Sequence, residues 1–181
     1  MFEIELKTWI DEKDAGEILK KLDDMGAVYK GSEKQADIYF NAPDRDFAKT
    51  DEALRLRKID SKFFLTYKGP KDSADIKARW EIEIPVDPGI SKILQQLRYN
   101  EAESVEKTRE KYKLNYEGMD VVVCIDRVLD LGIFMEIETQ AASNEKQGDA
   151  ILSLGEFLLG AKPVVIRESY LELLMKKKSD I

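Results

Sequence analysis

Charged and apolar residues alternate along segment after segment of this chain. The stretch EIELK near its start places Ile4 and Leu6 on one face of an extended strand. The other face carries three charges in a row: Glu3, Glu5 and Lys7. Period-two alternation predicts a β-strand buried on one side. The charged side is unusual, because like charges side by side on one face of a sheet are destabilising.

Six or more segments in all, this one included, have one apolar and one charged face. The charged faces of the others carry Arg55 and Arg57; Thr66 and Lys68; Lys77, Arg79, Glu81 and Glu83; Lys107, Arg109, Lys111 and Lys113; Asp126; and Glu136 and Glu138. An ordinary sheet can also have one solvated face. Such a face mixes Thr, Ser, Lys and Glu, whereas here carboxylates and cations occur in separate rows. The segregation indicates that the charged faces converge inside a closed, polar-lined barrel.

The intervening segments predict helices inserted between the strands and appended after them. After the opening strand, the strands are expected at 27–40, 53–59, 63–68, 77–86, 104–116, 119–128 and 132–140, with loops at 41–53 and 69–75. Helices are expected at 12–25, 89–98, 144–160 and 167–178. We therefore expect one α+β domain over residues 1–181: an eight-stranded antiparallel closed β-barrel with helices packed outside. The first helix and the C-terminal tail would cover its apolar face.

Composition excludes several classes of function. The net charge of −7 argues against a protein that mainly binds a nucleic-acid backbone. No apolar run approaches the roughly 20 residues that a membrane-spanning helix needs, and no signal peptide opens the chain. A single cysteine, Cys124, lies in the apolar run VVVCI, so we expect a buried thiol and a cytoplasmic protein. The 0 histidines remove His-based triads, His general bases and His-rich metal sites.

The remaining chemistry uses carboxylates, cations and oxygen-bound metals. Clustered Asp and Glu oxygens without His or Cys select hard divalent ions, Mg²⁺ or Mn²⁺, over zinc. Arg and Lys in several rows suit a polyphosphate, because each phosphoryl group needs its own partners. A metal and a polyphosphate in one tunnel indicate phosphoryl or nucleotidyl transfer, in which positioning and charge neutralisation supply most of the acceleration.

These motifs resemble those of the CYTH superfamily, also called triphosphate tunnel metalloenzymes. EIELK is similar to the family's ExExK signature, and its companions follow in the expected order: ALRLRK (53–58), LTYKGP (65–70), RWEIEI (79–84), VEKTREKY (105–112) and IDRVLDLGIFMEIE (125–138). Together they cover nearly the whole chain. The segments at 35–57 and 65–71 look closer to the class IV adenylyl cyclase branch than to the thiamine triphosphatase branch.

The resemblance implies a tunnel that binds a triphosphate, with ATP the expected substrate, together with Mg²⁺ or Mn²⁺. By this resemblance, the carboxylates expected to bind the metal are Glu3, Glu5, Glu136 and Glu138. The residues expected to bind phosphate oxygens are Lys7, Arg55, Arg57, Lys68, Lys107 and Arg109. Lys7, Arg109 and Asp126 are the expected catalytic residues, and Glu81 and Glu83 are further acidic tunnel positions. Similar cyclases suggest a homodimer.

Two reactions remain open at this point. A cyclase would convert ATP to cyclic AMP and pyrophosphate, whereas an inorganic or thiamine triphosphatase would hydrolyse the terminal phosphate. The cyclase-like loop segments favour the first. A non-catalytic nucleotide- or polyphosphate-binding module is disfavoured, because a pure anion binder gains nothing from repeated carboxylates. Tyr39, Phe40 and Phe47 could flank a base, although core packing is the favoured role for each.

Overall fold

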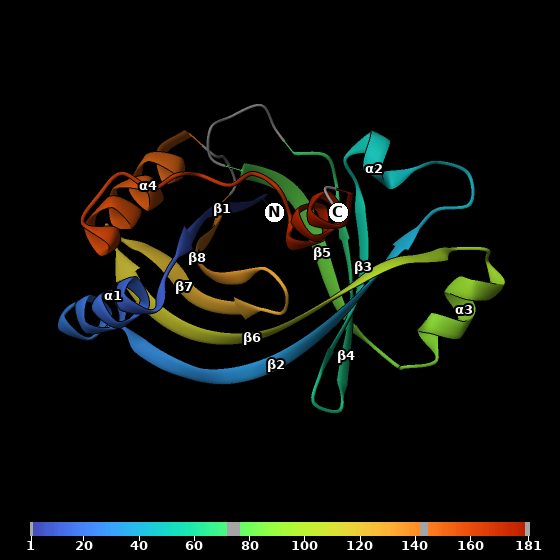
Figure 1. The fold of residues 1–181 in the computed structure, drawn as a ribbon, viewed down its shortest axis with the longest axis horizontal. Coiled ribbons are helices and arrows are strands. Elements are labelled where there is room, and N and C mark those ends of the chain that lie inside the picture. Colours follow the sequence, from blue (N-terminus) through green and yellow to red (C-terminus); the bar gives the residue numbers. More distant parts are fainter. Residues whose placement is uncertain (1, 72–76, 142–144, 180–181) are drawn as a thin grey trace.

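Eight antiparallel strands form one closed barrel in the computed structural model, which describes residues 2–71, 77–141 and 145–179 (Figure 1). The order of the strands around the barrel is β1-β5-β4-β3-β2-β6-β7-β8. Their bounds are β1 (Phe2–Ile10), β2 (Val28–Asn41), β3 (Ala53–Ile59), β4 (Lys62–Lys68), β5 (Lys77–Val86), β6 (Asn100–Tyr116), β7 (Met119–Val128) and β8 (Gly132–Ala141). The predicted closed barrel is therefore confirmed.

The helices lie close to their expected positions. They are α1 (Glu12–Asp24), α2 (Phe47–Thr50), α3 (Ile90–Gln96), α4 (Glu145–Leu159) and α5 (Tyr170–Ser179). The expected 41–53 loop contains the short helix α2, which begins where the Asp46 side chain accepts a hydrogen bond from the amide of Ala48. Residues 72–75 of the second expected loop and residue 144 of the first C-terminal helix lie outside the described residues.

Three helices cover part of the barrel's outer face. The core between α1, α4 and the strands contains Ile4 and Leu6 of β1 together with Ile18 of α1 and Leu154 of α4. Helix α1 is held at its start by a capping box between Asp11 and Asp14. A second apolar cluster packs α3 against β2 and β3. No helix among the described residues is long and apolar enough to cross a membrane.

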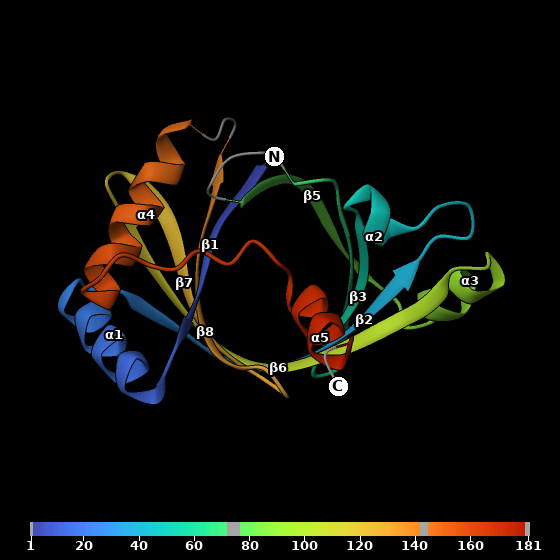
Figure 2. The ribbon, with the colours of Figure 1, turned by 45° about the horizontal axis from the view of Figure 1, so that its top comes forward.

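The helical cover differs from the expectation in two places. On β5 the outward side chains of Trp80, Ile82 and Ile84 remain 46%, 49% and 49% exposed, because no helix of the described residues packs on them. Helix α5 does not join the outer cover. Its Tyr170 and Leu174 pack with apolar side chains of the barrel interior: Tyr39, Val105, Val128 and Phe134. Figures 1 and 2 both show α5 within the outline of the ring of strands.

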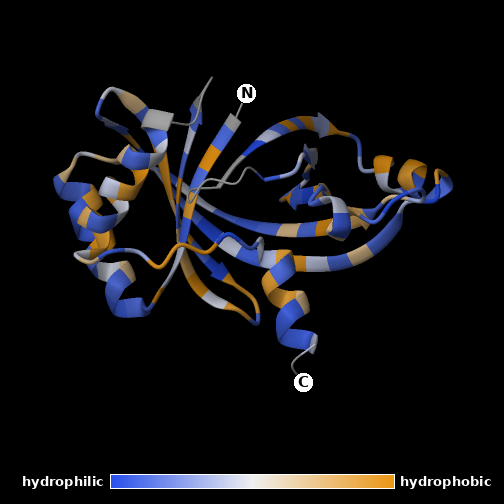
Figure 3. Ribbon diagram, turned by 90° about the horizontal axis from the view of Figure 1, so that it is seen from above, coloured by the Kyte–Doolittle hydropathy of each residue, from blue (hydrophilic) through white to orange (hydrophobic). Residues whose placement is uncertain are grey.

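Strand register brings the charged faces of distant segments together. Between β1 and β8, Glu5 lies opposite Glu138 and Lys7 lies opposite Glu136. Between β6 and β7, Arg109 lies opposite Asp126. Figure 3 shows the underlying alternation of hydrophilic and hydrophobic residues along the strands. A shift of one residue in any pairing would turn these charges outward, so the apolar outer core fixes the composition of the interior.

Candidate functional site: a charged tunnel

The barrel encloses a cavity of about 450 Å³ lined by charged side chains. All the residues that the sequence predicts to bind metal or phosphate line it: Glu3, Glu5, Lys7, Arg55, Arg57, Lys68, Glu81, Glu83, Lys107, Arg109, Glu136 and Glu138. Asp126 is fully buried behind Lys107 and Arg109. The structure thus brings the predicted site residues together from seven of the eight strands, and β2 adds residues of its own.

A group of three carboxylates forms the acidic part of the cavity. Glu5 of β1 and Glu136 and Glu138 of β8 each offer an oxygen, and these oxygens lie within 4.8 Å of one another. Three convergent carboxylates with no nitrogen or sulfur ligand fit a hard divalent cation such as Mg²⁺ or Mn²⁺. This carboxylate triad contains three of the four carboxylates that the sequence analysis expects to bind a metal.

Cations of the protein neutralise the carboxylate triad in this structure. The ammonium of Lys7 lies 3.1 Å from Glu5 and 3.2 Å from Glu136. Burial by itself would lower the pKa of Lys7, but the two carboxylates outweigh it and hold that pKa above its usual value. Burial raises the pKa of Glu138 to about 7, and neighbouring carboxylates add to the rise against the opposing charge of Arg109. Arg109 also donates to Glu136 and Glu138.

Asp126 organises the basic part of the cavity from behind. Its two oxygens accept hydrogen bonds from Nε and Nη2 of Arg109 at 2.7 and 2.6 Å. They also accept from Lys107 at 3.1 Å and from the hydroxyl of Tyr170 at 2.9 Å. Burial opposes the charge of Asp126, but Arg109 and Lys107 outweigh it and lower its pKa. Burial and the charge of Arg109 lower the pKa of Lys107 to about 8.

The opposite wall pairs the remaining cations with other carboxylates. Arg55 donates to Glu83 at 3.1 Å and to Thr66 at 3.1 Å. Lys68 lies 2.9 Å from Glu3 and 2.5 Å from Glu81. Glu3 therefore pairs with Lys68, while its charge also contributes to the raised pKa of Glu138.

The sequence interpretation gave no role to three residues of the interior. Asp37 of β2 is buried and binds Arg57 through two hydrogen bonds of 2.7 Å. The alternation of QADIYF places Asp37 on the same face as Gln35 and Tyr39, so that signal was available in the sequence. Tyr170 of α5 lies over two ammonium groups, with Lys7 4.4 Å and Lys107 4.7 Å from its ring centre. Nothing in the sequence of α5 indicates that it contributes to the interior.

Arg79 is the third interior residue that received no role. It is 5% exposed and lines the tunnel, and its Nε has no hydrogen-bond partner among the described residues.

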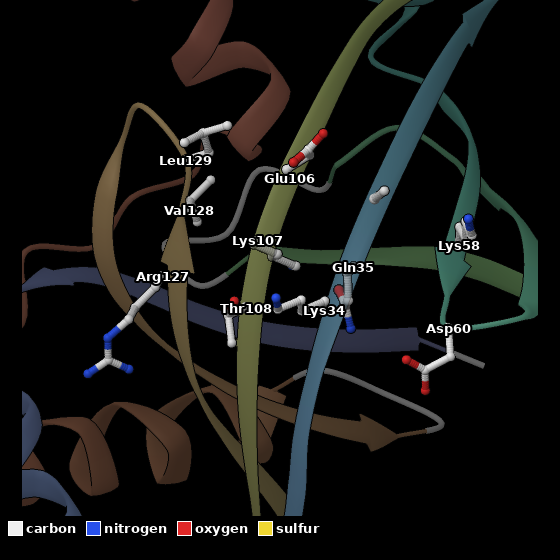
Figure 4. Close-up of a pocket in the computed structure, with 11 residues that line it drawn as sticks. Lys34, Gln35, Lys58, Asp60, Glu106, Lys107, Thr108, Arg127, Val128 and Leu129 are labelled. Atoms are coloured by element: carbon white, nitrogen blue, oxygen red, sulfur yellow. The ribbon is translucent and has the colours of Figure 1, made fainter.

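A second concavity lies outside the barrel, over β2 and β6. Figure 4 shows this outer groove, a wide depression of about 650 Å³ between the β3–β4 and β7–β8 hairpins. Lys34, Lys58 and Arg127 are spread around it and do not converge on a common point (Figure 4). The tunnel, where buried charges converge from many strands, is the stronger candidate for chemistry.

Comparison with known proteins agrees with this geometry. The family model of the CYTH domain matches residues 1–162. The chain belongs to the CYTH family. CYTH proteins are metal-dependent tunnel enzymes that bind triphosphate substrates, which matches a carboxylate triad beside rows of cations.

Individual relatives match nearly the whole length of this chain. A protein of Methanocaldococcus jannaschii named "Putative adenylate cyclase" is 38% identical over 178 residues, covering 96% of this chain and 98% of its own. A solved structure from Pyrococcus horikoshii OT3 is 38% identical, covers 97% of this chain and 99% of its own, and has a TM-score of 0.80. A Hippeastrum protein is named a "putative adenylyl cyclase" and described as having a dominant triphosphatase activity. Its structure has a TM-score of 0.73 at 15% identity and covers 97% of this chain and 95% of its own.

Proposed function

We propose that this CYTH protein is a class IV-type adenylyl cyclase that converts ATP to cyclic AMP and pyrophosphate with Mg²⁺ or Mn²⁺. The observation that carries the proposal is the carboxylate triad of Glu5, Glu136 and Glu138 directly beside the buried cations Lys7 and Arg109. A relative with 38% identity over nearly the whole length carries the cyclase name.

The cations of the tunnel are assigned to the triphosphate. Lys7, Arg55, Arg57, Lys68, Lys107 and Arg109 are buried and point into one cavity. Each is paired here with a carboxylate of the protein. Phosphate oxygens compete for the same N–H donors, and arginine binds phosphate in the bidentate geometry that it uses for carboxylate. Asp126 positions Lys107 and Arg109 for this exchange.

The carboxylate triad is assigned to the divalent ion, with Glu3 as a further ligand from the Lys68 side. Glu81 and Glu83 orient Lys68 and Arg55. A bound Mg²⁺ or Mn²⁺ neutralises phosphate charge and lowers the pKa of the attacking hydroxyl. The tunnel residues hold the triphosphate so that the ribose 3′-oxygen can form a bond to the α-phosphorus while the bond to pyrophosphate breaks.

Triphosphate hydrolysis is the second candidate, because the same groups would position a water against the terminal phosphorus. The Hippeastrum protein, named a putative adenylyl cyclase, is described as having a dominant triphosphatase activity, so a cyclase name alone does not separate the two reactions. At 15% identity this neighbour supports a common fold with the present chain and no particular reaction.

Product analysis separates the two reactions. The protein is incubated with ATP or inorganic triphosphate and with Mg²⁺ or Mn²⁺, and the products are separated by chromatography. Cyclic AMP with pyrophosphate from ATP supports the cyclase. Orthophosphate supports the triphosphatase, together with ADP when the substrate is ATP or with pyrophosphate when it is inorganic triphosphate. Absence of turnover with either metal contradicts both.

A matched pair of variants ties turnover to the tunnel. Glu5→Gln is expected to abolish metal-dependent turnover while circular dichroism shows an intact fold, because the carboxylate triad loses one of its three anionic ligands. Glu17→Gln changes an exposed glutamate of α1 in the same way and is expected to keep full activity. Full activity of Glu5→Gln would contradict the metal assignment.

A further inference from the structure

One end of the tunnel is lined by three lysines to which the proposed function assigns no role. Lys30 of β2 and Lys111 and Lys113 of β6 line the same cavity as the residues assigned to metal and phosphate. Lys30 and Lys113 are exposed to solvent and form no ion pair among the described residues. Lys111 pairs with Glu33 at 2.6 Å. These three lysines are called the lysine rim below.

Lys30 reaches the tunnel because β2 is irregular at this point. In a regular strand Lys30 would share a face with Lys34, which lines the outer groove. The register with β6 shifts between Tyr29 and Gly31, so Lys30 is the extra residue of a β-bulge. Gly31 has a φ of 108°, which favours glycine. Bulges re-aim side chains beside functional sites, and this one directs Lys30 into the cavity.

The two β6 lysines begin a row of cations that leads into the tunnel. Lys113, Lys111, Arg109 and Lys107 occupy alternate positions, roughly 6.5 Å apart along the strand. Their exposure falls along the row, from the exposed Lys113 to side chains that are 34% exposed for Lys111, 7% for Arg109 and 3% for Lys107. An anion held at the lysine rim therefore has another cation within reach at each step inward.

Helix α5 occupies the opposite end of the tunnel. Its Tyr170 and Leu174 pack with Val105 of β6 and Phe134 of β8. Val105 and Lys111 are roughly 20 Å apart along β6. A ligand anion that approaches the tunnel therefore meets a packed helix at one end and the lysine rim at the other.

The charge of the whole chain makes such a rim useful. The net charge of −7 repels an anionic ligand at long range, whereas cations grouped at the entrance of a cavity attract it and raise its local concentration. Lysine suits this role, because its flexible and strongly hydrated ammonium attracts an anion without fixing its geometry. Ordinary surface lysines require neither a β-bulge nor a position in the lining of the tunnel.

We propose that the lysine rim is the entry site of the tunnel, which captures polyphosphate anions from solvent and passes them along β6 to the buried cations. The inference rests on the proposed function only in that the tunnel binds a triphosphate, and it applies to a cyclase and to a triphosphatase alike. The lysine rim acts on the rate of association and takes no part in the chemical step.

The association rate of inorganic triphosphate tests the entry site without turnover. Phosphorus-31 exchange spectroscopy on metal-free protein gives the rates of association and dissociation. Lys30→Gln combined with Lys113→Gln is expected to lower the association rate roughly tenfold at low ionic strength and to change the dissociation rate less than about twofold. At about 0.5 M salt the loss should shrink to less than about twofold, because the Debye length is then only about 4 Å.

Two further double variants are the controls. Lys34→Gln combined with Lys58→Gln removes the same number of positive charges from exposed positions of the outer groove, and is expected to change the association rate less than about twofold. Lys30→Arg combined with Lys113→Arg keeps both charges of the rim and is expected to keep the native rate. All these positions are exposed, so the melting temperature should be unchanged in every variant.

The outcomes distinguish this inference from the proposed function. A native association rate in the Lys30→Gln and Lys113→Gln variant overturns the entry site. An equal loss in the outer-groove control, or a loss that persists at high salt, overturns it as well. If the native protein binds no triphosphate, the tunnel assignment falls, and the entry site falls with it. If the protein binds triphosphate but product analysis finds no turnover, the proposed function falls while the association rates still decide the entry site.

Discussion

Replacing Asp126 by asparagine tests whether this carboxylate organises the basic side of the tunnel. Asp126 is fully buried and receives four hydrogen bonds, two from Arg109 and one each from Lys107 and Tyr170. Asparagine keeps the shape of the side chain but removes the negative charge. One of its two terminal atoms becomes a donor that faces other donors, so some of the four bonds are lost.

The magnitude follows from what each cation can do afterwards. Lys107 can lose its proton, because its pKa is already lowered to about 8 and removal of the Asp126 charge lowers that pKa further. Arg109 cannot lose its proton, because the guanidinium stays protonated in proteins. It does retain Glu136 and Glu138 as partners. Removing one partner of a buried ion pair costs roughly 3–5 kcal/mol. We therefore expect the lower end, about 3 kcal/mol, and a melting temperature lower by roughly 6–12 °C for a chain of this size.

Urea unfolding at pH 7, followed by circular dichroism, measures this loss. Asp120→Asn is the matched control on the same strand. Asp120 is exposed, so its replacement is expected to change the free energy of unfolding by less than about 0.5 kcal/mol. Inorganic triphosphate should reduce the deficit of Asp126→Asn, because its oxygens provide new partners for Lys107 and Arg109. A loss below about 1 kcal/mol without ligand would refute the view that Asp126 holds these two cations.

Two further predictions concern Tyr170 and the pH dependence of the metal site. Tyr170→Phe removes the hydroxyl that donates to Asp126 but keeps the ring over Lys7 and Lys107. Urea unfolding should show that the free energy of unfolding falls by roughly 1.5–3 kcal/mol. An unchanged free energy of unfolding would contradict that hydrogen bond. Glu138 has a pKa of about 7, above its ordinary 4.5, so Mn²⁺ must displace a proton from it below pH 7. Calorimetry should therefore show that the Mn²⁺ affinity falls by up to about tenfold per pH unit below pH 7 and stays level above it. In metal-free protein the raised pKa of Glu138 has the opposite effect on folding: its contribution to the free energy of unfolding is fully present below about pH 4.5 and is lost as the pH rises to 7.

Alternation of charge made the barrel predictable from the sequence. A single strand face with Glu3, Glu5 and Lys7 is compatible with an ordinary solvent-exposed sheet. Several such faces with segregated charges instead indicate that they meet in a common interior. The register of β1 with β8 then follows from the apolar outer faces, and it places Glu5 beside Glu138. These pairings depend on local pattern, which is why the predicted tunnel residues meet in one cavity.

The contributions of α5 and of Arg79 were not predictable in the same way. Helix α5 has a weak apolar stripe, and its Tyr170 reaches the interior only because Phe134 and Val105 offer an apolar patch there. Asp37 was within reach of the alternation rule, since it shares a face with Gln35 on β2. Arg79 was recognised as inward-facing, but its lack of a partner among the described residues depends on the distances to every neighbouring carboxylate, which no strand pattern contains.

The paired charges of the tunnel explain how so many can be buried without a ligand. Each carboxylate of the triad is held by Lys7 or Arg109, and Lys107 and Arg109 share Asp126. A triphosphate and a divalent ion that enter together bring anions for the cations and a cation for the carboxylates. Binding of both ligands therefore replaces internal ion pairs with ligand contacts and leaves no cation or carboxylate of the tunnel without a partner. Either ligand alone breaks ion pairs but provides new partners only for the cations or only for the carboxylates. Metal and triphosphate should accordingly bind with positive coupling, and the affinity for each, measured by calorimetry with and without the other, should rise by the same factor.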